Sequence, residues 1–395
     1  MNTVFLAILL TSATPTFEAA TLDGRTIVGP IVALTPQRLT LAAGSDSVSI
    51  PTKQLLTVLP KQNPPAAVVA GVVVQLADGS VIQGRQYRAD GSRARITLAG
   101  GEVVEAPAGM VETVLCGALQ TAELKSDWAR LTSMKTDADL LIVRSGGGLD
   151  YQKGILHDVT EDVVRFDLDG KVLPAKRAKV FGLVYHHGAA VAMPSPICRI
   201  TDAAGSLWLV RSLSLGEKLQ WTTPAGVSAA QPLENIARID FSAGKLLYLS
   251  DLKPDSIAWT PFFAANEPPA AMKQLYAPRF DRGFDSPLLR LGHTDYQKGI
   301  ALHSRTELVY RLPERFGRFL ATAGIADAVR PAGKVRLVLR GDDKVLFEAA
   351  FAGGDKPRPL DVDVTGVRRL TILVDFADGI NRGDHLLLCN ARVSK

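Results

Sequence analysis

The sequence contains few cysteines and few aromatic residues. Among its 395 residues there are three cysteines, and the aromatic side chains make up 6%. Cys116, Cys198 and Cys389 lie far apart in apolar stretches and match no metal-ligand or redox spacing. A free cysteine in such a stretch behaves as a small buried hydrophobic residue. The pattern therefore argues against a disulfide framework, although it leaves room for one chance bridge.

An excess of one charge sign is also absent. The chain has 45 lysines and arginines against 40 aspartates and glutamates, which gives a net charge of +5. The densest basic group, Lys176, Arg177 and Lys179, is typical of the solvated face of a strand. A nucleic-acid-binding protein would gather many basic residues on one element. We therefore expect no nucleic-acid partner.

Long apolar runs are missing, apart from the beginning of the chain. Residues 4–10 are mostly apolar and small residues follow them, as in a short secretory signal. No lysine or arginine precedes this run, and a buried first strand is the alternative. Nothing later approaches the ~20 apolar residues that a helix needs to span a bilayer. We predict a signal peptide over residues 1–19 and a secreted, periplasmic or cell-surface protein with no integral membrane segment after signal removal.

Known catalytic motifs are absent as well. The sequence has no Gly-x-Ser-x-Gly elbow, no His-Glu-x-x-His and no phosphate-binding loop. His186 and His187 are adjacent, so on a strand they would point to opposite faces and make poor joint metal ligands. A glycoside hydrolase needs two carboxylates ~5–9.5 Å apart, which a sequence alone does not place. We expect no enzymatic activity, and a divergent glycoside hydrolase is the weaker alternative.

The sequence does contain many short segments in which apolar and polar residues alternate. Asp, Gly, Ser or Pro bound them, which predicts β-strands joined by tight turns, with Asp23-Gly24 as one hairpin signal. These segments recur with one shared layout. We therefore predict four β repeats, over residues 20–60, 71–116, 139–186 and 196–241. A linker helix is predicted over residues 118–134, because Leu124, Trp128 and Leu131 share one helical face.

A repeat of about 45 residues with five short strands is marginally stable alone. We expect small barrel-like repeats that pack in pairs, with one long meandering sheet as the alternative. After residue 245 a loop rich in proline and alanine is expected, ending near Arg279. About nine strands follow, which is typical of a β-sandwich. The predicted fold class is thus all-β, with barrel-like repeats followed by a β-sandwich over residues 245–395.

This last segment carries a recognisable set of strings. They are Tyr248-Leu-Ser-Asp251, Tyr296-Gln-Lys-Gly-Ile300, His303-Ser304 and Gly383-Asp-His385. Together with the surrounding strands they resemble the NPCBM family of carbohydrate-binding modules. The resemblance covers residues 245–395 and implies a jelly-roll, galactose-binding-like β-sandwich. It also implies a glycan partner, with a galactose-type sugar among the candidates.

Three features qualify this resemblance. The family's usual ending has a tryptophan and a second aspartate where this chain has Leu388 and Leu387. A tryptophan there could be a sugar platform or a core residue, so its replacement bears on glycan binding and not on the fold. The string at residues 295–300 recurs letter for letter at residues 150–155, where the different flanks favour coincidence. The upstream repeats resemble, more loosely, those of planctomycete-type exported proteins, which implies an architecture and no activity.

A sugar site needs a planar apolar surface and a few fixed polar groups. The C-terminal module offers Trp259 as its tryptophan. The predicted carbohydrate-binding residues are Tyr296, Lys298, His303, Asp384 and His385. The alternative for Tyr296 and His303 is a buried, hydrogen-bonded structural role.

Oxygen-bearing side chains also follow one another near the end of the chain. Asp375, Asp378, Asn381 and Asp384 offer the hard oxygen ligands that calcium prefers. The sequence leaves a structural calcium ion open at these residues and predicts no other cofactor.

We therefore predict a non-catalytic, exported carbohydrate-binding protein that presents a glycan-binding β-sandwich module. The competing hypothesis is an envelope scaffold, in which the repeats bind other proteins and the module has lost its sugar site. Leu388 favours the scaffold, whereas the intact Tyr-x-Lys-Gly-Ile string favours glycan binding. The sequence names neither the glycan nor a protein partner.

Overall fold

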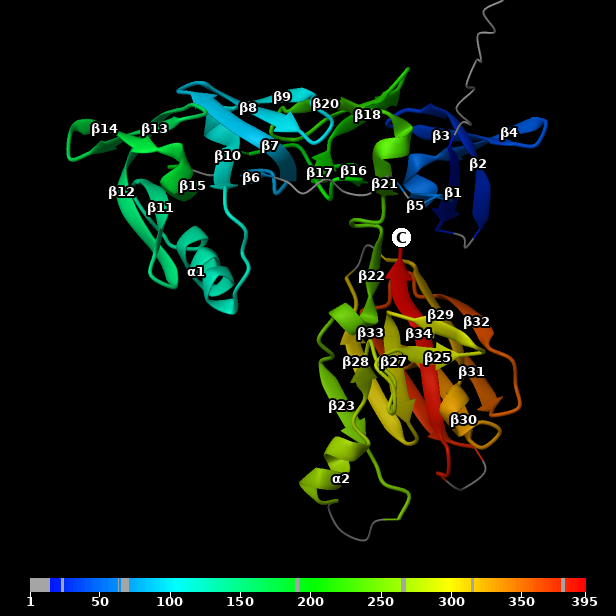
Figure 1. The fold of residues 1–395 in the computed structure, drawn as a ribbon. Helices are drawn as coiled ribbons and strands as arrows, with labels where there is room; N and C mark the ends of the chain where they lie inside the picture. The colour runs from blue at the N-terminus through cyan, green and yellow to red at the C-terminus, as the bar shows by residue number, and fades with distance from the viewer. Residues whose placement is uncertain are drawn as a thin grey trace, which may run out of the picture. The chain divides into compact units, whose positions relative to one another are not determined.

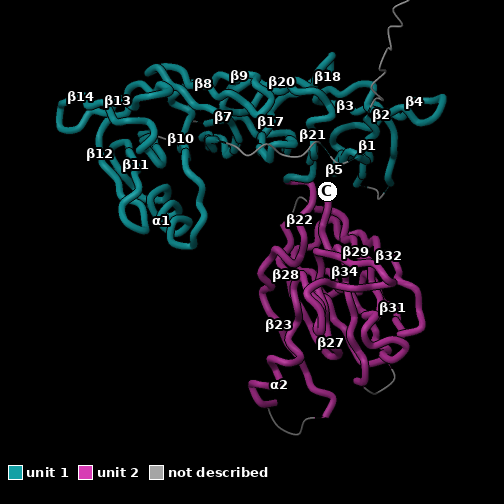
Figure 2. The backbone as a smooth tube through the Cα atoms, viewed as in Figure 1, with its two compact units in different colours: residues 1–243 teal, residues 244–395 magenta. Residues whose placement is uncertain are grey.

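The computed structural model describes residues 15–22, 25–62, 64, 71–188, 192–263, 268–313, 316–377 and 381–395. The chain forms two compact units, residues 1–243 (unit 1) and 244–395 (unit 2) (Figure 2). Strands predominate in both units, so the predicted all-β fold class is confirmed. The Asp23-Gly24 turn signal and residues 1–14 of the expected signal peptide lie outside the described residues. Residues 16–19, the last part of that predicted segment, instead belong to a paired strand (Thr16–Thr21) with Phe17 and Ala19 in the core.

The described part of unit 1 shows one strand arrangement four times (Figure 1). In the first group consecutive strands pair antiparallel, and the fifth strand returns to pair with the first. The second and third groups have the same order. In the fourth group the second strand is split in two, and the last strand again pairs with the first.

The strands of the first group are β1 (Thr16–Thr21), β2 (Thr26–Leu34), β3 (Arg38–Ala43), β4 (Asp46–Pro51) and β5 (Leu55–Pro60). Those of the second are β6 (Val72–Leu76), β7 (Val81–Asp90), β8 (Arg93–Leu98), β9 (Val103–Pro107) and β10 (Val111–Leu115). Those of the third are β11 (Asp139–Ser145), β12 (Gly148–Val159), β13 (Val163–Leu168), β14 (Lys171–Lys176) and β15 (Val180–Val184). Those of the fourth are β16 (Cys198–Asp202), β17 (Leu207–Val210), β18 (Ser212–Leu215), β19 (Leu219–Thr222), β20 (Ser228–Gln231) and β21 (Ile236–Asp240).

The four groups are joined by further strand pairing and by one shared core. β5 pairs with β21, and β10 pairs with β15, so closing strands meet across groups. β7 also pairs with β12 and with β17. Apolar residues from all four groups form a single buried cluster that includes Phe17, Ile82, Phe166 and Trp208. A five-stranded group alone buries little apolar surface, so this sharing supplies the missing core.

One helix, α1 (Ala122–Thr132), follows the second group. The Thr121 hydroxyl accepts a hydrogen bond from the amide of Leu124 and so caps the helix N-terminus. Leu124 and Leu131 are buried in a separate cluster with residues of β11, β12 and β15. The helix therefore covers a face of the third group.

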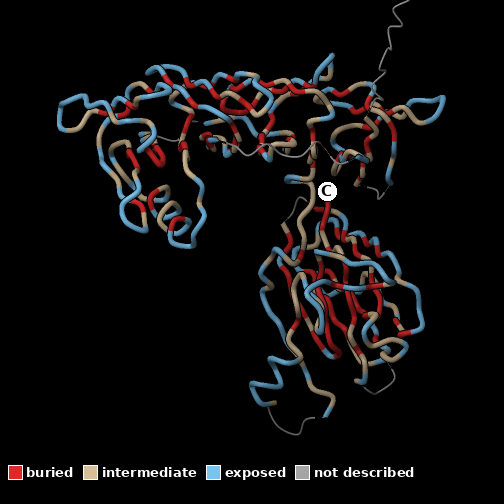
Figure 3. Tube along the Cα trace, in the orientation of Figure 1, coloured by how far each residue is buried: buried red, intermediate tan, exposed pale blue. Residues whose placement is uncertain are grey.

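Unit 2 is a β-sandwich of two antiparallel sheets. One sheet has the order β24-β27-β34-β29-β32, with β22 beside β34. The other has the order β23-β28-β33-β30-β31. Ile300, Leu302, Leu308 and Tyr310 belong to the core between the sheets. Figure 3 shows the buried stretches along the strands of this unit. The hairpin β25–β26 contributes to a smaller cluster with Ala301, Leu387 and Cys389 of β27 and β34.

The elements before the long strands are β22 (Leu246–Tyr248), β23 (Ser256–Trp259), α2 (Ala270–Leu275), β24 (Arg279–Phe280), β25 (Leu289–Leu291) and β26 (Thr294–Tyr296). The remaining strands are β27 (Gly299–His303), β28 (Thr306–Arg311), β29 (Arg318–Ile325), β30 (Lys334–Gly341), β31 (Lys344–Ala352), β32 (Arg358–Asp363), β33 (Arg369–Phe376) and β34 (His385–Ser394).

The expectation of an unbroken loop before Arg279 was wrong. That stretch contains the edge strand β23 and the short helix α2. β23 has no alternation of buried and exposed residues, since Ser256, Ile257 and Ala258 are all exposed. Its pairing with β28 through the backbone therefore leaves little trace in the sequence. In the described residues, no helix is long and apolar enough to span a bilayer.

Candidate functional site

A cluster of aromatic rings lies at one end of unit 2. Trp259 and Tyr276 stack with ring centroids 4.6 Å apart and planes 7° from parallel. Tyr276 also contacts His303 edge-on, with the two ring centroids 4.6 Å apart. Phe284 contacts both His303 and His385 at 4.8 Å, and the two imidazoles are 4.3 Å apart. We call these five residues the aromatic platform.

Strand register brings the platform together. Trp259 ends β23 and pairs with Thr306 at the start of β28. His303 ends β27 and pairs with His385 at the start of β34. Tyr276 directly follows α2, whose position beside β23 is fixed by the ring stack. We call this end of the sandwich the α2 end (Figure 1).

A buried carboxylate holds the turn beneath the platform. Asp384 is fully buried and accepts hydrogen bonds from the Ser304 hydroxyl at 2.6 Å and from the Lys334 amide at 2.9 Å. The carbonyl of Ser304 in turn accepts a hydrogen bond from the Trp259 indole at 3.2 Å. Asp384 thus positions the Trp259 ring through Ser304. Its burial assigns it a structural role beneath the site.

The two histidines of the platform are neutral near pH 7. Burial, with a smaller contribution from the neighbouring His385, lowers the pKa of His303 from 6.5 to about 3. Burial also lowers the pKa of His385. His303 is 8% exposed, and within the described residues its Nδ1 has no hydrogen-bond partner. This nitrogen is itself buried, so His303 contributes its ring to the platform and leaves one polar atom unpaired among the described residues of the module.

Two of the predicted site residues lie elsewhere. β27 runs from Gly299 to His303, so Lys298 and His303 are about 15 Å apart along an extended strand. The Lys298 ammonium is bound by Asp251 at 2.5 Å and Asp281 at 2.8 Å. Tyr296 packs in the cluster formed around the β25–β26 hairpin, and burial raises its pKa. The structure therefore brings His303, Asp384 and His385 together and leaves Tyr296 and Lys298 apart from them.

The predicted calcium ligands have other partners where the structure describes them. Asp375 binds the Arg336 guanidinium at 3.0 Å and lies 3.6 Å from that of Arg305. Asp384 accepts hydrogen bonds from Ser304 and Lys334. Asn381 is half-buried, and Asp378 lies outside the described residues. Among the residues described, no group of three or more His, Cys, Asp or Glu could hold a metal ion. The calcium site stays a prediction.

Sequence reasoning missed Tyr276 and Phe284. Both are half-buried aromatic residues outside the strands, Tyr276 at the end of the stretch expected to be loop and Phe284 just after it. The signal that could have found them is composition, because Trp259, Phe262, Phe263, Tyr276 and Phe284 gather there in a chain with 6% aromatic residues. Aromatic residues concentrated in a loop region often mark a binding surface.

The structure shows where Leu388 and Leu387 lie, the residues at the positions of the family's tryptophan and second aspartate. Leu388 is fully buried in the core between the two sheets, where it pairs with Ile300 of β27. Leu387 is buried as well and packs in the β25–β26 cluster. In this chain both positions therefore belong to the packed interior, and neither lies on the aromatic platform.

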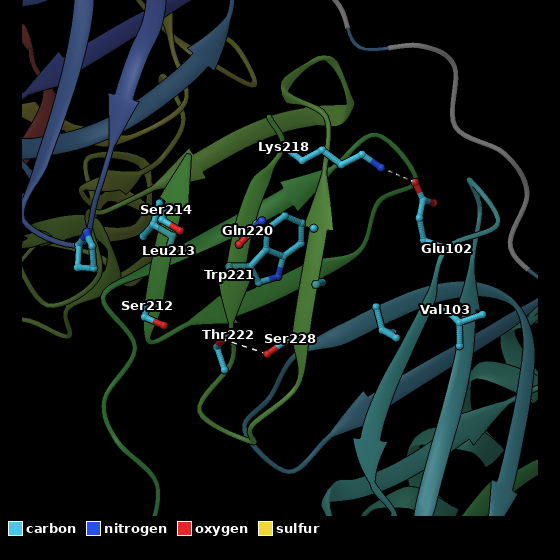
Figure 4. A pocket seen from close by; sticks show the side chains of 14 residues that line it. Glu102, Val103, Ser212, Leu213, Ser214, Lys218, Gln220, Trp221, Thr222 and Ser228 are labelled. Carbon is cyan, nitrogen blue, oxygen red and sulfur yellow. Dashed lines mark hydrogen bonds and ion pairs between the residues drawn. The ribbon is translucent and has the colours of Figure 1, made fainter. Parts of the chain in front are cut away.

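Unit 1 contains a groove of its own, with a volume of about 680 Å³ (Figure 4). Side chains lining it from β18, β19 and β20 include Ser212, Ser214, Gln220, Thr222 and Ser228. Lys218 and Glu102 approach to 3.9 Å at its side. Trp221 also borders the groove but is 2% exposed and packs against Trp208 in the core. Val103, Leu213, Ala229 and Ala230 line the groove as well, so its lining mixes polar and apolar side chains and contains no exposed aromatic ring.

Comparisons with known proteins identify the C-terminal unit. Residues 248–394 match the model of the NPCBM/NEW2 domain. This match confirms the resemblance found in the sequence for these residues. A search of curated proteins found no match for the chain.

Solved structures similar to the chain include CBM51 modules. CBM51 from Clostridium perfringens GH95, in complex with methyl-galactose, is 18% identical, with coverage of 38% of this chain and 99% of that one and a TM-score of 0.32. CBM51-2 with GlcNAc and the INT domains of C. perfringens ZmpB is 21% identical, with 47% and 37% coverage and a TM-score of 0.33. The tandem CBM51 modules of a Streptococcus pneumoniae family 98 glycoside hydrolase are 13% identical, with 66% and 88% coverage and a TM-score of 0.32. Likeness at this level supports no statement about function.

Proposed function

We propose that unit 2 is a carbohydrate-binding module that holds a sugar on the aromatic platform. The observation that carries this is the half-buried Trp259–Tyr276 stack, which continues edge-on to His303 at one end of the sandwich. A sugar ring presents C–H groups to an aromatic face and hydroxyl groups to nearby polar atoms. The match of residues 248–394 to the NPCBM/NEW2 domain supports the same function.

The site supports binding without catalysis. Acid–base catalysis of glycoside hydrolysis uses two carboxyl groups that flank the scissile bond. Near the platform, Asp384 is buried under Ser304 and Asp375 is bound by arginines. Asp285, which is exposed beside His385, is therefore the one of these carboxyl groups that is free to face a sugar. His303 is uncharged near pH 7 because its pKa is about 3, so it is not set up as a general acid. We therefore propose a non-catalytic module.

A glycan array with the full chain tests the proposal. We expect binding to at least one glycan class, and we expect Trp259→Ala and Tyr276→Ala to abolish it. Lys298→Ala and Tyr296→Ala serve as matched controls, since both lie away from the platform and should keep binding. Binding lost in the controls and kept in the platform variants would place the site at Tyr296 and Lys298 instead.

The groove of unit 1 favours a second function, the binding of another protein. It is open, polar and apolar side chains both line it, and three strands of the fourth group border it together with Glu102 and Val103 of the second. In this alternative the chain is an envelope scaffold. A pull-down from native envelope that compares the unchanged chain with Gln220→Arg tests it. A partner that binds in the groove should be captured by the unchanged chain and lost from the variant.

Export is part of the proposal as well. The apolar stretch at residues 4–10 motivates it. N-terminal sequencing of the mature protein from its native source tests it. Residues 16–19 belong to β1, and Phe17 and Ala19 are buried in the core, so a cleaved signal peptide that leaves the fold intact predicts a start just before Thr16. A mature chain that begins at Met1 would contradict export by this route.

A further inference from the structure

Exposed apolar side chains gather in one short segment of unit 2, residues 256–276. Its described residues include Ile257, Phe263, Met272 and Leu275, with exposed fractions of 50%, 87%, 42% and 63%. In the rest of the unit's described residues, the large apolar side chains that are exposed are Leu288 at 37% and Val345 at 55%. Scattered exposed residues are ordinary, whereas a concentration of this kind marks an interaction surface.

This segment is anchored at both of its described ends. The Trp259–Tyr276 stack joins the end of β23 to the end of α2. Phe262 packs edge-on against Phe376 of β33, with centroids 5.0 Å apart, and against Phe263 at 4.4 Å. Phe263 therefore projects into solvent from a fixed neighbour at the α2 end. We call Phe263, Met272 and Leu275 the apolar tip.

The charged side chains near the apolar tip include cations from α2 and from the start of β28. Lys273 lies within α2, and the Arg279 guanidinium donates to the Gln274 carbonyl at the end of that helix. Arg305, at the start of β28, is half exposed and shares Asp375 with Arg336. Asp285, beside His385, is an exposed acid near the platform. Apolar side chains framed by aromatic rings and cations suit the interface of a bilayer with anionic lipids.

We propose that the apolar tip docks unit 2 on a lipid surface. Phe263 and Leu275 enter the boundary between headgroups and acyl chains, and Lys273 and Arg305 face the anionic headgroups. A lipid interface needs no shape complementarity, which matches single projecting side chains better than the packed pockets of protein interfaces. The docking does not depend on the glycan site. It orients the α2 end, and with it the aromatic platform, toward the membrane.

Vesicle co-sedimentation with the full chain tests the proposal. The probe is phosphatidylcholine vesicles with and without phosphatidylglycerol. We expect the chain to bind, more strongly with phosphatidylglycerol, and the double variant Phe263→Ser, Leu275→Ser to bind at least ~10-fold more weakly, because each change removes a buried apolar contact. Val345→Ser is the matched control, since Val345 lies beside the β30–β31 turn at the opposite end of β30 from Lys334 and should bind normally.

Three outcomes would overturn the proposal. They are no vesicle binding by the unchanged chain, equal binding by the double variant, and equal loss in Val345→Ser. Sedimentation velocity separates a further case. If the unchanged chain dimerises, the double variant is monomeric and neither binds vesicles, the apolar tip binds a second copy of the chain instead. A failure on vesicles with binding kept on the glycan array would reject the lipid proposal alone.

Discussion

Replacing Asp384 tests whether the platform depends on the buried carboxylate. In Asp384→Ala, the Ser304 hydroxyl and the Lys334 amide lose their acceptor at a site with no solvent exposure. A hydrogen bond to a charged group contributes about 1.5–3 kcal/mol, so the loss of two should lower the free energy of unfolding of unit 2 by about 3–6 kcal/mol. Asp384→Asn keeps one acceptor oxygen and should cost roughly half as much.

Hydrogen–deuterium exchange on peptides from β27 and β34 measures the loss of stability in the full chain, because these peptides report on unit 2 separately. Asp361→Ala is the control. Asp361 binds Arg318 at 2.6 Å but is half exposed, and water screens such a surface pair, so its loss should change stability little. If Asp384→Ala changed exchange no more than Asp361→Ala does, the assigned role of Asp384 would be wrong.

The remaining predictions concern pH, one glycine and one helix cap. The folded-state pKa of His303 is about 3 and the unfolded value 6.5, so stability should be full above pH 6.5 and fall by up to ~1.4 kcal/mol per pH unit below it; His303→Leu should flatten this dependence in urea denaturation. Gly299→Ala should lower the melting temperature by several degrees, because a Cβ would lie 2.4 Å from the Leu388 carbonyl at a φ of +147°, whereas Gly354→Ala, with open space around it, should not. Thr121→Ala should destabilise α1 by ~1 kcal/mol, which faster exchange of that helix's amides would register.

The sequence predicted the fold class because apolar alternation and turn residues are local signals. β6 is an example, in which Val72, Val74 and Leu76 are buried while the residues between them are half-buried. The four strand groups and α1 have comparable local patterns. What the sequence did not predict was β23, whose pairing is made by the backbone of exposed residues.

The candidate site was predicted in part. His303, Asp384 and His385 were predicted, because they belong to the strings His303-Ser304 and Gly383-Asp-His385 that carry the family resemblance. Their grouping with Trp259 and Tyr276 depends on strand register, which a single sequence does not give.

The repeated hexapeptide shows the limit most clearly. At residues 150–155 it lies within the continuous strand β12, whereas at 295–300 it spans the end of β26, a turn and the start of β27. Gly299 adopts a positive φ and Gly154, its counterpart in the first copy, does not, although a neighbouring strand approaches both backbones closely. The same six residues therefore adopt different structures at the two places because they contact different neighbouring strands.

The central claim is that the aromatic platform binds a sugar, and titration of Trp259→Ala with a glycan that the unchanged chain binds tests it most directly. Isothermal calorimetry should give a dissociation constant for the unchanged chain and for Lys298→Ala that agree within about twofold. It should detect no heat of binding with Trp259→Ala, provided that hydrogen exchange shows unit 2 still folded. Equal affinity in Trp259→Ala and the unchanged chain would contradict the account.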